Sequence, residues 1–245
     1  MKRIMLKVAY DGTNYHGWQI QPNGETIEGV LNRCLSELLQ EKIEVIGASR
    51  TDSGVHAREN IAVFDTESPI PPKKVANALN ARLPDDIRIQ DSEEVNADFH
   101  PRKCVSRKTY EYRIYNAPFS MPTERLYSYF TYVPLDIEKM REAAVYFIGT
   151  HDFKSFCSVD TQAESTVRQV DSIEVNKDGN LIAIRVSGRG FLYNMVRIMA
   201  GTLMEVGRGR LEPADIARIL EAKDRTTAGP TAPACGLTLI KYEFL

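Results

Sequence analysis

A β-hairpin is predicted by the segment Ile173-Glu174-Val175-Asn176-Lys177-Asp178-Gly179-Asn180-Leu181-Ile182-Ala183-Ile184-Arg185-Val186. Apolar residues alternate with others on both sides of its centre, and an Asp-Gly pair between such segments is a strong signal for a tight turn. We therefore expect antiparallel strands near 168–176 and 181–187. The remaining elements of this half can be placed relative to the hairpin.

The elements outside the hairpin follow a simple order. A strand near 108–116 and a helix from about Asp136 to Phe147 are expected before it, because apolar residues there recur with strand and helix periods. Helices near 191–206 and 213–222 and a last strand from Leu237 to Tyr242 are expected after it. The order is β-α-β-β-α-β, which is the split βαβ order of ferredoxin-like folds.

The first half of the chain predicts the same order. A helix near 27–39 has apolar residues at three- and four-residue spacing, and Pro71-Pro72 opens a second helix through about Arg82. The strands of this half are expected near 4–10, 43–48, 60–65 and 87–90. We therefore predict an α+β protein of two ferredoxin-like halves with largely antiparallel sheets, residues 1–100 and 101–245.

The composition is that of an ordinary globular protein with an uneven charge. Of 245 residues, 43% are hydrophobic and 26% charged, which excludes disorder, a collagen repeat and a disulfide scaffold. Lys and Arg number 31 against 33 Asp and Glu, so the net charge is −2. Residues 102–125 nevertheless hold six basic and two acidic residues, and residues 185–210 hold five and one. These two windows suit contacts with phosphate groups.

Targeting and metal-binding signals are weak. The first seven residues hold too few apolar residues for the apolar region of a signal peptide. The apolar run 191–206 is interrupted by charged residues, so it does not predict a membrane-spanning helix. The four cysteines and four histidines are scattered, without a Cys-x-x-Cys pair. We therefore expect a cytoplasmic protein with reduced thiols, no metal site and no membrane attachment.

One polar loop distinguishes the first half from the second. The second half needs only a short turn between its central strands, whereas the first half carries Ala48-Ser49-Arg50-Thr51-Asp52-Ser53-Gly54-Val55-His56-Ala57 at that place. A long polar connection in place of a short turn suggests a functional site. Taken alone, however, an aspartate such as Asp52 in this context is typical of a turn or a cap.

Two other functions fit parts of the sequence. A noncatalytic tandem RNA-recognition-motif protein would share the order of elements, but the stacking aromatics of that motif are missing from 60–65 and 181–186. Gly188-Arg189-Gly190-Phe191 resembles the motif only superficially. A glycoside hydrolase would need a second carboxylate about 5–9 Å from Asp52, and Glu59 is merely the nearest in sequence.

The whole loop resembles part of a known family. The catalytic loop of the tRNA pseudouridine synthase A family is similar to Gly47-Ala48-Ser49-Arg50-Thr51-Asp52-Ser53-Gly54-Val55-His56-Ala57. Other blocks of that family are matched in chain order by Tyr10-Asp11-Gly12-Thr13-Asn14-Tyr15-His16-Gly17-Trp18-Gln19, Asp98-Phe99-His100-Pro101-Arg102, Lys108-Thr109-Tyr110-Glu111-Tyr112, Gly190-Phe191-Leu192-Tyr193-Asn194-Met195-Val196-Arg197, Ala222-Lys223-Asp224-Arg225 and Gly236-Leu237-Thr238-Leu239. The resemblance covers essentially the whole chain.

The resemblance implies a pseudouridine synthase fold with a central cleft. It implies an isomerase that converts uridine to pseudouridine at positions 38, 39 and 40 of the tRNA anticodon arm, without a cofactor. Asp52 would be the nucleophile, attacking either C1′ or the uracil ring, and Arg197 would form an ion pair with it. Tyr110 would stack on the uracil, and its hydroxyl is a candidate to accept the C5 proton. The substrate-binding residues would be Tyr110, Arg50, Leu237 and His56, and the partners tRNA and a second copy of the chain.

Overall fold

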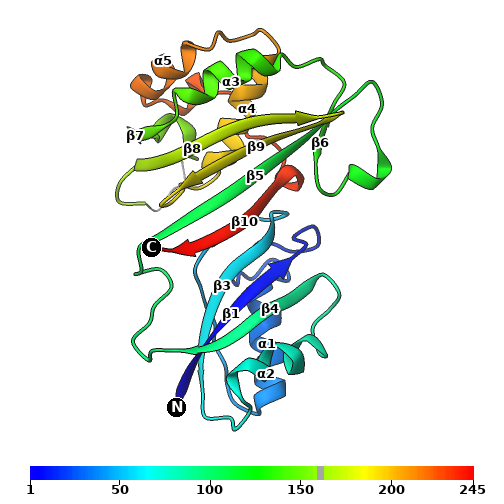
Figure 1. Ribbon diagram of the computed structural model, residues 1–245, viewed down its shortest axis with the longest axis vertical. Coiled ribbons are helices and arrows are strands. Elements are labelled where there is room, and N and C mark those ends of the chain that lie inside the picture. The colour runs from blue at the N-terminus through cyan, green and yellow to red at the C-terminus, as the bar shows by residue number, and fades with distance from the viewer. Residues whose placement is uncertain (159–162) are drawn as a thin grey trace. The chain divides into compact units, whose positions relative to one another are not determined.

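The predicted hairpin is present in the computed structural model, which describes residues 1–158 and 163–245. Strand β8 (Val167–Asp178) pairs antiparallel with β9 (Leu181–Gly188), with Val175 opposite Ile184 (Figure 1). Gly179 turns the chain with a φ of 55°, which a glycine adopts without strain. The chain forms two compact units, residues 1–106 with 239–245, and residues 107–238.

The second unit extends the hairpin into a larger sheet. Its strand order is β5-β9-β8-β7, and each neighbouring pair is antiparallel. The short β6 pairs parallel with β5. The bounds of these three strands are Ser106–Asn116 for β5, Tyr129–Thr131 for β6 and Gly149–Asp152 for β7. The sequence patterns did not predict β6 and β7, which are three and four residues long.

The helices of the second unit pack on one another and on this sheet. Helix α3 (Ile137–Val145) contacts both α4 (Met195–Gly207) and β8. Almost every residue of α4 is buried, which identifies it as a core helix. It begins later than the expected position near 191, because Asn194 has a φ of 60° and is not helical. Helix α5 (Asp215–Ala222) buries only one face.

The first unit has the predicted ferredoxin-like order. Strand β1 (Lys2–Tyr10) lies between β3 (His56–Thr66) and β4 (Ile87–Val95) and is antiparallel to both. Strand β2 (Ile46–Gly47) pairs with β3, so that only two residues of the strand expected near 43–48 are formed. The sheet order in this part is therefore β4-β1-β3-β2.

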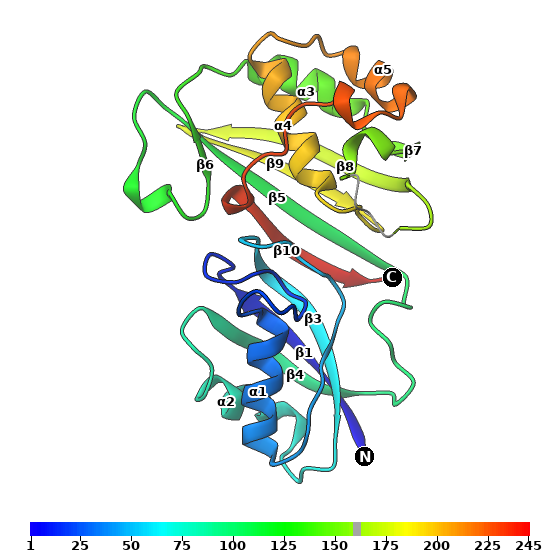
Figure 2. The same ribbon diagram turned by 180° about the vertical axis from the view of Figure 1, so that it is seen from behind.

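Two helices lie on one face of this sheet (Figure 2). Helix α1 (Ile27–Leu39) has the bounds that its apolar spacing predicted, and it begins where the Thr26 hydroxyl accepts a hydrogen bond from the Gly29 N–H at 3.2 Å. Helix α2 (Pro72–Asn80) begins with a proline, which has no N–H to leave unpaired. Contacts of α2 with β4 and of α1 with α2 close this layer.

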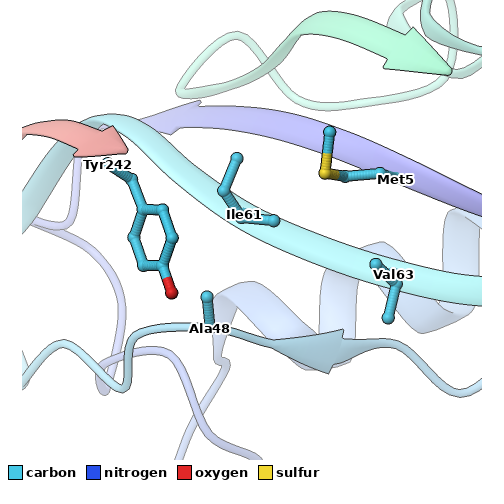
Figure 3. Close-up of a cluster of buried hydrophobic side chains, with 5 residues drawn as sticks. All are labelled: Met5, Ala48, Ile61, Val63 and Tyr242. Atoms are coloured by element: carbon cyan, nitrogen blue, oxygen red, sulfur yellow. The ribbon is translucent and has the colours of Figure 1, made fainter. Parts of the chain in front are cut away.

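Strand β10 (Leu237–Phe244) is placed differently from the expectation that it completes the second half. Residues 239–245 belong to the first unit, where β10 is the neighbour of β3. The Tyr242 hydroxyl lies 2.9 Å from both Pro101 O and Ser106 Oγ, so it donates to the carbonyl and accepts from the serine. A buried cluster explains the placement (Figure 3), and its members are Met5, Ala48, Ile61, Val63 and Tyr242.

Candidate active site

Asp52 lies in a tight turn between β2 and β3. Its backbone carbonyl accepts a hydrogen bond from the Val55 N–H at 3.1 Å, and Gly54 completes the turn with a φ of 75°. The Asp52 side chain is half-buried, the preceding Thr51 is buried and Arg50 is exposed. Asp52 is therefore a half-buried residue on a turn whose backbone is fixed.

A glycine-containing segment before α1 supports this turn. The Trp18 N–H donates to Thr51 O at 3.0 Å, and the Gly54 N–H donates to Tyr15 O at 3.2 Å. A Cβ atom at Gly17 would lie 2.7 Å from Thr51 O, so only a glycine allows the two backbones to approach this closely. The N-terminal motif is thus joined to the turn by its backbone.

The side-chain amide of Asn60 holds the start of the same loop. Asn60 is fully buried on β3, and its Oδ1 accepts from the Ser49 N–H at 3.2 Å and from the Ile61 N–H at 2.9 Å. Its Nδ2 donates to Ser49 O at 2.9 Å. The two backbone N–H groups fix which side of the amide is the oxygen, because both of them can only donate. Asn60 therefore binds both backbone groups of Ser49.

The second Nδ2 hydrogen of Asn60 sets the direction of a hydrogen-bond chain. It is donated to the Tyr10 hydroxyl oxygen at 3.2 Å. That hydroxyl also lies 2.7 Å from the Thr51 Oγ1, so its own proton is free to be donated to Thr51. Burial raises the pKa of Tyr10, which keeps the phenol protonated and able to donate. The chain Asn60–Tyr10–Thr51 ends at the residue before Asp52.

His56 lies at the start of β3 with only 4% of its surface exposed. Its Nδ1 is 3.0 Å from the Gly12 backbone nitrogen and 3.1 Å from the Asp11 Oδ1. The Gly12 N–H needs an unprotonated Nδ1, whereas the Asp11 carboxylate needs a protonated one, so the two hydrogen bonds exclude each other. In either form, His56 joins β3 to the turn that follows β1.

Positive charge gathers near the exposed Arg50. Burial and the charge of Arg50 both lower the pKa of the Arg102 guanidinium. The guanidinium groups of Arg50 and Arg102 are thus within electrostatic range of each other, and Glu28 acts on Arg102 with the opposite sign. Neighbouring guanidinium groups of this kind are suited to bind phosphate.

Tyr110 lies on β5 of the second unit, opposite Val186 of β9. Only 9% of its surface is exposed. Its ring meets the Phe191 ring edge to face, with 5.2 Å between centroids and an interplanar angle of 86°. Phe191 therefore fixes the plane of the Tyr110 ring.

Arg197 lies in the first turn of α4 and is half-buried. Its Nε donates to Ala232 O at 2.7 Å and its Nη1 donates to Asn194 Oδ1 at 2.7 Å. The backbone is held to the same residue, because the Ala232 N–H donates to Arg197 O at 3.1 Å. These two bonds, to a backbone carbonyl and a side-chain amide, orient the guanidinium.

Leu237 is buried at the start of β10, directly after a 3-10 turn at Ala234–Gly236. The Tyr112 hydroxyl donates to Pro233 O at 2.9 Å, which holds this segment on β5. A Cβ atom at Gly236 would lie 2.7 Å from the Tyr112 ring. Since residues two apart on a strand share a face, Tyr110 and Tyr112 lie on the same side of β5.

The structure thus groups the expected residues by unit. Arg50, Asp52 and His56 lie in the first, and Tyr110, Arg197 and Leu237 in the second. The supporting residues Asn60 and Tyr10 were not predicted, although a polar side chain before the apolar run of β3 was a signal for Asn60. Among the described residues, no group of three or more His, Cys, Asp or Glu side chains could hold a metal ion, and no helix is long and apolar enough to cross a membrane.

The fold and the site describe an α+β protein that holds a half-buried aspartate on a hydrogen-bonded turn. The family model described as tRNA pseudouridine synthase matches residues 7–102 and 143–244. The chain therefore belongs to the tRNA pseudouridine synthase family, and it is an isomerase of that family.

Individual relatives agree with this assignment over their full length. A "tRNA pseudouridine synthase A" of Thermoanaerobacter sp. (strain X514) is 47% identical over 244 residues, which is 100% of both chains. Another, of Ruminiclostridium cellulolyticum, is 50% identical over 245 residues, again with 100% of both chains covered. Among solved structures, a chain of a Cbf5–Nop10–Gar1 complex is 14% identical with a TM-score of 0.33, and the match covers 82% of this chain and 54% of that one. A similarity at this level adds nothing to the assignment.

Proposed function

We propose that the protein isomerises uridine to pseudouridine at positions 38, 39 and 40 of the tRNA anticodon arm, with Asp52 as the nucleophile. The observation that supports this most strongly is the fixed backbone around Asp52. Hydrogen bonds from the backbone N–H groups of Trp18, Val55 and Gly54 hold the turn, and Asp52 itself is half-buried. A loop with a fixed backbone holds its nucleophilic side chain in one position, which favours covalent catalysis.

The reaction is an isomerisation, so it leaves the elemental composition of the uridine unchanged. The N1–C1′ bond breaks, the uracil rotates and a C5–C1′ bond forms, while C5 loses a proton and N1 gains one. A carboxylate that attacks C1′ holds the ribose while the detached uracil turns in the site, and one that attacks the uracil ring holds the base instead. In both routes the bond to the carboxylate breaks when the product is complete. No oxidant, reductant or leaving group is consumed.

The proposed role of Arg197 is to keep the carboxylate ionised. RNA that covers Asp52 removes water and thereby favours the neutral acid, whereas a neighbouring guanidinium favours the charged form. The hydrogen bonds from Arg197 to Ala232 O and Asn194 Oδ1 hold its guanidinium in a fixed orientation. We infer that it pairs with Asp52 in the complex with RNA.

The remaining residues are proposed to bind the substrate. In this proposal the Tyr110 ring stacks on the uracil and its hydroxyl accepts the C5 proton, while Leu237 packs against the base. The exposed Arg50 binds backbone phosphate. His56 acts on the substrate through the turn after β1 that it anchors. The target base lies in or beside a stem, so it must leave the stack before Asp52 reaches it.

We also propose that the chain works in the cytoplasm as a homodimer on tRNA, following the family resemblance. Sedimentation of the protein with and without tRNA tests the homodimer, and a monomer in both runs contradicts it.

A noncatalytic RNA-binding protein is less well supported by the fold. Stacking platforms need exposed aromatic rings on the central strands of a sheet. On β3, residues 60–64 are all buried, and the alternating Ile182, Ile184 and Val186 of β9 are fully buried.

One assay separates the candidate functions. The protein is given tRNA labelled with tritium at uracil C5, and we expect the label to enter water while the base stays attached to the ribose. Release of free uracil would identify a glycoside hydrolase. Stable binding of the tRNA without release of tritium would identify a binding protein. Either of these two results contradicts the proposal.

A further inference from the structure

Arg225 belongs to the motif 222–225, for which the site described above has no role. It opens a 3-10 turn at Arg225–Thr227 after α5 and is half-buried. Its Nη1 lies 3.0 Å from Gly229 O and 3.5 Å from Ala228 O, and its Nη2 lies 3.1 Å from Thr231 Oγ1. Every hydrogen bond of this guanidinium in the described part of the chain thus ends on an oxygen of the segment 228–231.

The segment held by Arg225 lies directly on helix α4. The Gly229 N–H donates to Thr202 Oγ1 at 3.0 Å, and a Cβ atom at Gly229 would lie 2.7 Å from the Thr202 Cα. A Cβ atom at Gly201 would collide with Pro230 O. Backbone therefore packs directly against backbone here. The position of the segment depends on Gly229, on Gly201 of α4 and on its hydrogen bonds.

The next residue of the segment is Ala232, which exchanges two hydrogen bonds with Arg197. Its N–H donates to Arg197 O at 3.1 Å, and its carbonyl accepts from the Arg197 Nε at 2.7 Å. The two arginines thus form hydrogen bonds with the same short segment. Arg225 binds residues 228–231 and Arg197 binds residue 232. A shift of this backbone moves the acceptor that orients the Arg197 guanidinium.

We propose that Arg225 is a positioning residue, whose guanidinium fixes the segment 228–232 and through it the orientation of Arg197. The proposal rests on the function proposed above for Arg197. These contacts with several oxygens require an arginine. A planar guanidinium donates hydrogen bonds in several fixed directions, whereas a lysine ammonium is a single point charge. Burial lowers the pKa of Arg225, in keeping with a group taken from water to bind backbone oxygens.

The first test measures the segment itself by hydrogen exchange in the full-length protein. Arg225→Gln and Arg225→Lys are expected to raise the exchange rate of the Ala232 and Gly229 N–H groups about fivefold or more, the amount that one lost hydrogen bond implies. The matched control is Arg218→Gln, because Arg218 is an exposed arginine of α5 that pairs with Asp215 one turn away. Unchanged exchange in both Arg225 variants overturns the proposal.

The second test measures catalysis by tritium release. Arg225→Gln is expected to lower kcat about 10- to 100-fold with little change in KM for tRNA, because a small misplacement of a catalytic group has that effect. In an Arg197→Lys background the same change is expected to cost much less, since both act on one guanidinium. Equal losses in the two backgrounds, or a loss that follows only the thermal unfolding midpoint, overturn the proposal.

The two tests distinguish a failure of the proposed function from a failure of the role proposed for Arg225. If the wild-type protein releases no tritium, the proposed function is wrong, and the exchange rates still show whether Arg225 holds the segment. If the wild type is active and the Arg225 variants exchange normally, only the role of Arg225 is wrong. The Arg225→Lys variant retains the charge and shows whether the shape of the guanidinium matters.

Discussion

The Asn60 amide donates a hydrogen bond to the Tyr10 hydroxyl at 3.2 Å, and this bond leaves the phenol proton for Thr51, the neighbour of Asp52. The Asn60 Nδ2 donates to Ser49 O and to the Tyr10 hydroxyl, and its Oδ1 accepts from the Ser49 and Ile61 N–H groups. All donors and acceptors of this amide are therefore used. A buried amide whose donors and acceptors are all used holds the groups around it in place. The rigidity of the Asp52 turn thus comes partly from a residue of β3.

We expect Tyr10→Phe to destabilise the fold by about 1–3 kcal/mol, because it leaves a buried donor of Asn60 without its acceptor. Its kcat is expected to fall while KM for tRNA changes little, because Thr51 loses a partner next to Asp52. Urea unfolding and tritium release measure the two effects. Tyr132→Phe, which changes an exposed tyrosine, is the control. Wild-type stability of Tyr10→Phe contradicts the assigned role of the Tyr10 hydroxyl as a partner of Asn60.

We expect Asp52→Asn to lose turnover by about a thousandfold or more while it still binds tRNA. An amide has nearly the shape of the carboxylate but is a poor nucleophile, so binding survives and covalent chemistry does not. Tritium release and filter binding give the two values, with Asp85→Asn as a control at a fully exposed aspartate. Near-wild-type release by Asp52→Asn would show that another group is the nucleophile.

We expect Arg50→Gln and Arg102→Gln each to lower the salt dependence of tRNA binding. A lost phosphate contact lowers the slope of log K against log salt by about one. The slope is measured by titrations between about 50 and 200 mM salt. Arg33→Gln is the control, because this exposed arginine pairs with Glu25 on the surface of the first unit. An unchanged slope in both variants means that the pair does not touch phosphate.

The pH dependence of stability is expected to reflect the pair Arg3–Asp65. The two residues are opposite each other on β1 and β3, with Arg3 donating to both carboxylate oxygens at 2.8 and 2.7 Å. The hydrogen bond from Arg3 lowers the pKa of Asp65, so its contribution is present above the usual carboxyl range near 4 and is lost as pH falls through the lower, folded value.

Asp65→Asn is therefore expected to be less stable than wild type at pH 7, by less than about 1 kcal/mol because the pair is partly exposed. The difference should disappear as the pH falls below the folded pKa of Asp65. Urea unfolding at pH 7 and in acid checks this. A difference that grows in acid contradicts the sign of the shift.

Local patterns predicted most of the elements, and distant contacts decided the rest. Helix α1 and the hairpin around Gly179 depend on the spacing of neighbouring side chains, so their positions were predicted correctly. Only two residues of the strand expected near 43–48 pair with a neighbouring strand. Pairing requires a partner strand in register as well as apolar residues. Helix α4 begins at Met195 because the left-handed Asn194 precedes it, which no periodicity reveals.

The sequence by itself determined the two βαββαβ series, the family and the residues proposed for the chemistry, because these depend on residue order and on motifs read along the chain. Only the tertiary structure decided that residues 239–245 join the first unit, that Asn60 and Tyr10 support the turn at Asp52, and that Arg225 and Arg197 hold one segment. These relationships join residues far apart in the chain, and a hydrogen bond or a buried cluster exists only once the fold brings its partners together.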